Sequence, residues 1–171
     1  MINPAYVLTM ARYNAWQNKQ MKAAMEELSE DALRKERGAF FGSIMATANH
    51  ILWADRMWMA RLLGKTPPQE GMQQSTTLTP TYAVWSAERF RMDGRILLWA
   101  EKCTALDLVG ELRWYSGVLG REASRPVGLV LTHMFNHQTH HRGQIHAMLT
   151  EAEAKAPVSD LIFMPEDGPW L

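Results

Sequence analysis

Apolar residues recur along most of this chain every three to four positions, the spacing that is typical of amphipathic helices. This pattern predicts four long helices, at residues 4–28, 44–63, 80–103 and 126–152. Ser43 and the pair Thr79-Pro80 suit the starts of the second and third helices, and Gly64 suits the end of the second. We therefore expect an all-α fold, a four-helix bundle that forms a single domain over residues 1–171.

The segments between and after these helices have other patterns. Ser29 suits the start of a short helical piece after the first helix, and a polar loop is expected to run up to Thr79. Residues 104–125 combine apolar residues with glycines, which predicts an extended or hairpin-like crossover connection. The tail, residues 157–171, holds three prolines and an apolar run at 161–164. We expect this tail to pack on the surface of the bundle.

The composition argues against several classes of protein. The 171 residues include 18 basic and 18 acidic side chains, so the formal net charge is zero, and there is no run of Lys or Arg. This balance argues against nucleic-acid binding. One cysteine, Cys103, allows no internal disulfide and fits a reducing compartment. The start of the chain does not resemble a signal peptide, and no apolar stretch approaches the roughly 20 residues of a membrane span. We expect a cytoplasmic protein without membrane contact, whose 12 Met and 7 Trp fill the core and part of a subunit interface.

Histidines are concentrated in the fourth predicted helix. Five of the six lie there: His133, His137, His140, His141 and His146. Two histidines four residues apart lie on one helix face, where both imidazoles can reach one metal ion. Spacing alone leaves several pairs open. At about 100° per residue, however, His137 and His141 fall in or beside the apolar arc of the helix. His133 and His140 fall toward solvent and His146 falls on the far side, so the angles select His137 and His141.

The remaining histidine, His50, lies in the middle of the second helix. The polar sector of that helix is narrow and is formed mainly by Asn49 and Arg56, so His50 lies within a broad, largely apolar arc. A facing helix of a bundle could bring His50 to the histidine pair and complete a three-histidine metal site. The alternative is a core or interface histidine.

Two other polar residues fall among apolar positions. Asp55 should be buried, and a buried carboxylate must be paired. It could accept a hydrogen bond from a ligand histidine. An ion pair or cap with the first helix, through Arg12 or Asn14, is the interpretation that we favour. Gln138 lies within the apolar arc of the fourth helix and also needs a buried partner.

Residues 136–144 read Asn-His-Gln-Thr-His-His-Arg-Gly-Gln and closely resemble the signature of the DinB family of damage-inducible-type proteins. Shorter matches lie at residues 13–16, 43–50, 55–58 and 159–162. The resemblance implies an up-down-down-up four-helix bundle, usually a homodimer. It also implies one metal ion, held by a histidine of the second helix and two of a later helix. On this sequence those ligands are His50, His137 and His141.

Three neutral imidazoles on Zn²⁺ or Ni²⁺ would leave at least one coordination position for water or substrate, which favours a catalytic site. The relatives that the resemblance implies include S-transferases that use bacillithiol or mycothiol, and a thiol-dependent maleylpyruvate isomerase. We therefore expect a metal-dependent enzyme of thiol-transferase or hydrolase type, acting on a low-molecular-weight thiol or another small molecule. The alternative is a non-catalytic stress-response or binding protein in which the metal braces the bundle. A DNA-binding role, which the family's name suggests, fits poorly with zero net charge.

Four residues are candidates for the surroundings of the metal: Asp55, His140, Arg142 and Gln144. His140 and Arg142 neighbour the ligands in sequence and could meet an anionic substrate or move protons at the rim. By the helical angles both point away from the core, and we favour their interpretation as solvated surface residues.

Overall fold

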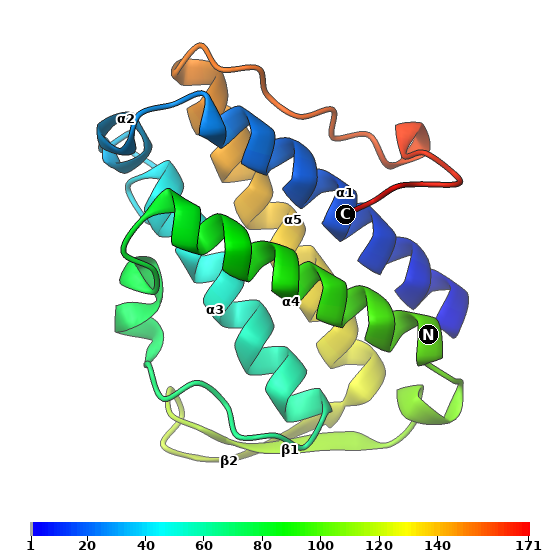
Figure 1. The fold of residues 1–171 in the computed structure, drawn as a ribbon. Helices are drawn as coiled ribbons and strands as arrows, with labels where there is room; N and C mark the ends of the chain where they lie inside the picture. The colour runs from blue at the N-terminus through cyan, green and yellow to red at the C-terminus, as the bar shows by residue number, and fades with distance from the viewer. Residues whose placement is uncertain (1) are drawn as a thin grey trace.

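The computed structural model describes residues 2–171, and four long helices make up most of it (Figure 1). They are α1 (Pro4–Glu26), α3 (Ile44–Leu62), α4 (Tyr82–Lys102) and α5 (Val127–Glu151). The side chains of Asn3, Ser43 and Thr81 cap the first three of these by accepting a backbone N–H from the third residue after each cap. Each predicted helix end lies within two residues of the observed one.

The predicted start of α4 was wrong by two residues. Thr81, not Thr79, is the N-cap, and Pro80 lies outside the helix. Thr79 instead donates two hydrogen bonds to the Asn49 side-chain oxygen, from its backbone N–H at 3.2 Å and its hydroxyl at 2.8 Å. The Thr79 hydroxyl, which local sequence preference assigns to capping the helix, therefore makes a tertiary contact with Asn49 instead.

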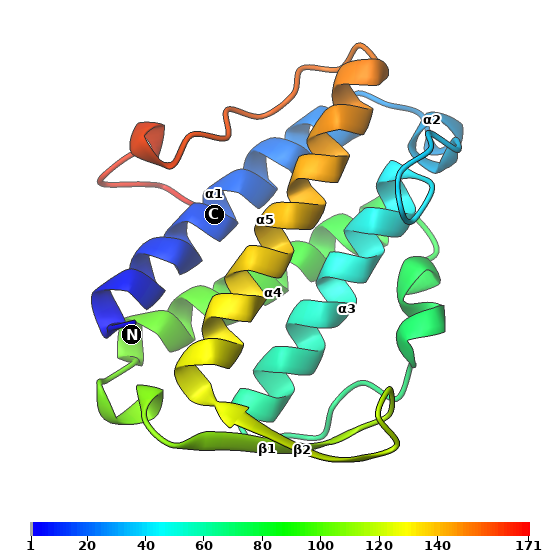
Figure 2. The same ribbon diagram turned by 180° about the vertical axis from the view of Figure 1, so that it is seen from behind.

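The long helices pack side by side. α1 and α5 run in one direction and α3 and α4 in the other, and α5 lies between α1 and α3 when seen from behind (Figure 2). Apolar side chains fill the interior, and its largest buried members include Trp85, Phe135, Ile44, Leu52 and Leu131. Burying one such side chain contributes about 1.5–3 kcal/mol to stability. The prediction that methionines fill the core is confirmed for Met21, Met25, Met45, Met59, Met92, Met134 and Met148.

Shorter elements connect these helices. Ser29 caps the short helix α2 (Glu30–Arg34), as predicted, and η2 (Leu106–Leu108) follows α4. A short 3-10 helix, η1 (Met72–Thr77), lies in the segment predicted as a polar loop. β1 (Glu111–Ser116) and β2 (Arg121–Pro126) pair antiparallel across one end of the helical body (Figure 1). The protein is therefore mostly helical with one small two-stranded sheet. The hairpin-like connection was predicted, and the all-α expectation is confirmed as a mostly helical structure that also holds this small sheet.

The C-terminal tail packs on the surface of the helical body, as predicted; it runs back along α1 and carries the 3-10 helix η3 (Leu161–Phe163) (Figure 1). The Tyr13 hydroxyl donates to the Ser159 carbonyl at 2.5 Å, and the Gln17 amide donates to the Val158 carbonyl at 2.6 Å. Within residues 2–171, none of the helices combines the length and the apolar character that crossing a membrane requires.

A buried ion network lies between the long helices. Arg89 of α4 donates to Asp55 of α3 at 2.6 Å and approaches Asp93 at 2.8 Å. The other oxygen of Asp55 accepts the Gln138 side-chain amide at 2.7 Å. The prediction that Asp55 pairs with α1 through Arg12 or Asn14 was wrong, because α4 and α5 supply its partners. Gln138 has the buried partner that its position requires.

The network continues to α1. Asp93 accepts hydrogen bonds from the side chains of Asn14 at 3.1 Å and Asn18 at 2.8 Å. Asn14 in turn accepts a hydrogen bond from Arg142 of α5. The network therefore joins all four long helices and contains two arginines and two aspartates. Arg142 is buried against α1, so its interpretation as a solvated surface residue was wrong.

Burial changes the titration of this network. Burial alone would lower the pKa of Arg89, but the neighbouring carboxylates of Asp93 and Asp55 raise it. Burial raises the pKa of Asp93 to about 6, against the opposing effect of Arg89, and lowers the pKa of Arg142 to about 10. Both arginines are therefore cationic at neutral pH.

Replacing Asp55 should destabilise the protein strongly. Asp55→Ala removes a partner of the buried Arg89 charge and leaves the Gln138 amide without an acceptor, so we expect a loss of about 3–5 kcal/mol in the free energy of unfolding, measured with urea. Glu88→Ala is the matched control, because its ion pairs with Arg56 and Arg91 are partly exposed to solvent and not buried. It should cost no more than about 1 kcal/mol. Similar losses in the two variants would contradict the central role of the network.

Candidate metal centre

Three histidines from two helices meet in the structure. His50 projects from α3, and His137 and His141 project from successive turns of α5. One ring nitrogen from each lies within 4.8 Å of the other two, and the Nε2 atoms of His50 and His137 are 3.1 Å apart. The packing of α3 beside α5 makes this meeting possible (Figure 2).

The other histidines of α5 lie where the helical angles predicted. His133 and His140 are exposed, and their rings flank the cluster at centroid distances of 5.7 Å from His137 and 4.9 Å from His141. His146 faces the other way and donates to the Pro157 carbonyl at 3.1 Å. The apolar arc of the helix therefore distinguished the histidines correctly.

Ser75 determines which ring nitrogen of His50 carries the proton. The single hydroxyl proton of Ser75 is donated to the Met72 carbonyl at 2.6 Å. The Ser75 oxygen, 3.0 Å from His50 Nδ1, must then act as the acceptor. His50 therefore carries its proton on Nδ1 and directs the lone pair of Nε2 toward the other two histidines.

Gln144 determines in the same way which ring nitrogen of His141 carries the proton. His141 Nδ1 lies 2.8 Å from the Gln144 side-chain oxygen, which can only accept a hydrogen bond. The Gln144 amide nitrogen lies 3.4 Å from the His140 ring, which agrees with this orientation of the amide. The lone pair of His141 is therefore on Nε2. Such outer hydrogen bonds hold a metal-binding imidazole in the correct tautomer and orientation.

Sequence reasoning missed Ser75, because a serine in a polar loop has no periodicity that connects it with His50. Asn49 holds this segment in place. Its amide donates to the Thr76 carbonyl at 3.3 Å, and its oxygen accepts the two hydrogen bonds from Thr79. Asn49 was predicted on the polar face of its helix, but it is buried beneath this segment, which covers that face.

Aromatic side chains form one wall of the cluster. The Phe41 ring lies 4.1 Å from the His50 ring, centroid to centroid, and 5.3 Å from that of His141. The Trp53 ring lies 5.8 Å from that of His50. His137 is half-buried, and its ring lies 5.7 Å from that of the exposed His133 and 4.4 Å from that of His141. The cluster therefore has an apolar cover over His50 and an imidazole-rich side nearer to solvent.

All three histidines are poor bases in this environment. Burial, with a smaller contribution from His141, lowers the pKa of His50 to about 4. Burial, with the neighbouring imidazoles, lowers the pKa of His137 to about 3, and burial also lowers that of His141. The three rings are therefore neutral at physiological pH, which is the state that binds metals.

The geometry fits a small divalent ion. Nitrogens bound at 2.0–2.1 Å to one tetrahedral ion lie about 3.3–3.4 Å from each other. The observed 3.1 Å between His50 and His137 is close to this separation. Three neutral imidazoles are also a donor set that suits Zn²⁺ and Ni²⁺.

Two of the four predicted neighbours do not contact the cluster. The oxygens of Asp55 are bonded to Arg89 and Gln138, so Asp55 does not orient a ligand histidine. Arg142 extends toward α1, away from the three rings. His140 and Gln144 lie beside the cluster.

Known proteins resemble this chain in sequence and in fold. The family model for the DinB family matches residues 1–167. Protein DinB of Bacillus subtilis (strain 168) is 27% identical over 158 residues, which cover 89% of this chain and 90% of that protein. The crystal structure of a DinB-like protein from Bacillus cereus ATCC 10987 superposes with a TM-score of 0.62 and 18% identity, over 84% of this chain and 90% of that one. The last comparison concerns the fold alone.

The metal-free protein should lose stability as the pH falls from 7 to 5. An unfolded histidine takes up a proton near pH 6.5, whereas His50 and His137 do so only near pH 4 and 3 in the folded protein. Below pH 6.5 the unfolded chain therefore binds more protons, and the free energy of unfolding falls by up to about 1.4 kcal/mol per pH unit for each imidazole. Urea titrations with a chelator at pH 7, 6 and 5 measure this slope. His137→Gln should make it shallower, and an unchanged slope would contradict the assignment.

Proposed function

This chain belongs to the DinB family, and we propose that it binds one divalent metal ion, Zn²⁺ or Ni²⁺, through His50, His137 and His141. The observation that carries this proposal is the convergence of three neutral imidazoles within 4.8 Å. The hydrogen bonds from His50 to Ser75 and from His141 to Gln144 support it, because they leave the Nε2 lone pairs free for a ligand role.

We propose further that the protein is a metal-dependent enzyme of thiol-transferase or hydrolase type. Three protein ligands leave at least one position open, and a bound ion lowers the pKa of a water or thiol in that position. The Phe41 ring packs on the His50 ring and covers that side of the site. The exposed His140, beside His141, is suited to exchange protons with solvent. A low-molecular-weight thiol or another small molecule is the substrate in this proposal.

The alternative is a stress-response or binding protein in which the metal braces the fold. Its support is that the ligands come from two different helices, so an ion would link α3 to α5. Against it stands the bond between Asp55 of α3 and Gln138 of α5, which already joins these helices without a metal.

The remaining features are proposals as well: the helix order and the homodimer are what the family resemblance implies, and the location is what the composition favours. The four long helices form one up-down-down-up bundle domain in the proposed assignment. The protein acts as a homodimer in the cytoplasm, and exposed apolar side chains such as Phe40 and Ile162 are available for a subunit contact.

Metal analysis of untagged protein tests the ligand assignment. Wild type should carry about one metal ion per chain by elemental analysis, and His50→Ala and His137→Ala should each lose it. His140→Ala is the matched control and should retain the metal, because His140 is the exposed neighbour of the site. Ser75→Ala should weaken metal binding about 10–100-fold without loss of helix, since it removes an outer hydrogen bond. Full metal retention in His50→Ala or His137→Ala would refute the assignment.

Removing the metal distinguishes the enzyme from the brace. If the site is catalytic, a chelator should leave the far-ultraviolet circular dichroism at 25 °C unchanged, because the buried network holds the helices together. The melting temperature should then fall only by the amount expected when a ligand that binds the folded state is removed. Loss of helical signal on chelation would instead favour the brace, in which metal binding and folding are coupled.

A further inference from the structure

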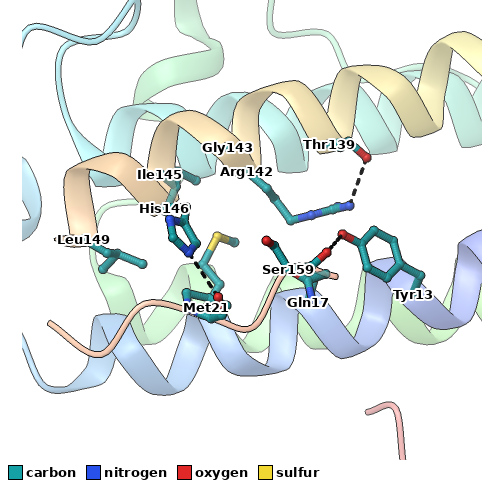
Figure 3. A pocket seen from close by; sticks show the side chains of 11 residues that line it. Tyr13, Gln17, Met21, Thr139, Arg142, Gly143, Ile145, His146, Leu149 and Ser159 are labelled. Carbon is teal, nitrogen blue, oxygen red and sulfur yellow. Dashed lines mark hydrogen bonds between the residues drawn. The ribbon is translucent and has the colours of Figure 1, made fainter. Parts of the chain in front are cut away.

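A separate cavity lies on the other side of α5 from the histidine cluster. It has a volume of about 320 Å³ and is enclosed by α1, α5 and the C-terminal tail (Figure 3). The tail is held there by hydrogen bonds from His146, Gln17 and Tyr13 to three successive carbonyls, those of residues 157–159. The volume is at the lower end of the range for small-molecule sites.

One end of this cavity is polar and cationic. The guanidinium of Arg142 lies there between Thr139 and Tyr13 (Figure 3), and 7% of the Arg142 surface is exposed. Its Nη2 atom is 3.4 Å from the Thr139 hydroxyl, and its other bond goes to Asn14. These contacts leave several of its five N–H donors free.

This arginine has no direct anionic partner. Among residues 2–171, no carboxylate oxygen lies within 4 Å of its guanidinium, and its connection to Asp93 runs through Asn14. A buried guanidinium normally pairs with a carboxylate or phosphate, often through two parallel hydrogen bonds. Arg142 therefore offers an unfilled position for an anion at the end of the cavity.

The opposite end of the cavity has buried apolar side chains and one imidazole, that of His146, which donates to the Pro157 carbonyl. Met21, Ile145 and Leu149 line it (Figure 3). A ligand that satisfies both ends has one negative charge and a short apolar body. Inorganic phosphate would leave the apolar end unfilled, and a neutral apolar molecule would leave the guanidinium unpaired.

We propose that this cavity binds a small monocarboxylate with an apolar body. The carboxylate accepts hydrogen bonds from Arg142, and the body lies beside His146, over the buried side chains of Met21, Ile145 and Leu149. The site is distinct from the histidine cluster, because Arg142 and the histidines project from different faces of α5. The proposal therefore does not depend on the bound metal.

Calorimetric titration of the full-length protein tests this proposal, with hexanoate as the probe. Hexanoate should bind at one site, and hexanamide and inorganic phosphate should bind at least about 10-fold more weakly, because each lacks one of the two features. His137→Ala should bind hexanoate as wild type does. Loss of binding in His137→Ala would place the carboxylate at the metal site and overturn the proposal, as would equal binding of hexanamide or no binding of hexanoate.

Two variants test the position of the ligand. Arg142→Gln should weaken hexanoate binding by about 10-fold or more. Ser159→Leu fills part of the cavity while its backbone carbonyl keeps the bond from Tyr13, and it should weaken binding about 5-fold or more. Asp160→Leu, next to it in the tail, is the matched control and should have no effect. If Arg142→Gln does not fold, Ser159→Leu decides the question, and unchanged affinity in Ser159→Leu would overturn the proposal.

Discussion

The contact of Arg89 with Asp55 and Asp93 is the interaction on which the arrangement of the helices depends. Arg89 is fully buried, and a buried charge that loses its partner costs several kcal/mol. The methionine-rich core, in contrast, can adapt to several packings, because Met side chains are flexible. We infer that the ion network, rather than the apolar core, determines which faces of the four helices meet.

The network also sets the geometry of the histidine cluster. Asp55 of α3 and Gln138 of α5 are joined by a hydrogen bond, and His50 and His137 lie on the same two helices. The buried Asp55–Gln138 bond therefore holds together the same two helices that carry the histidines. A shift of one turn, about 5.4 Å, would separate the histidines completely. The buried ion network therefore contributes both to the stability of the core and to the alignment of the candidate metal ligands.

Helix α5 has two chemically different buried faces. Its histidines lie against α3, and Arg142 lies against α1 and the tail. In the two proposals, the neutral imidazoles make one side of the helix a cation-binding face, and the arginine makes the other side an anion-binding face. Such a helix can carry both only because neighbouring elements cover it on both sides.

The sequence by itself determined the positions of the helices and placed His137 and His141 on the buried side of α5, because these depend on local periodicity. It also indicated the hairpin-like connection through its glycines. Only the tertiary structure decided which partners cover each face. Ser75 is 25 residues from His50, and Gln138 is 83 residues from Asp55. Arg142 lies outside the apolar arc, yet α1 buries it. Periodicity shows which positions avoid water, but a contact between distant segments depends on how the helices pack, and no local pattern records it.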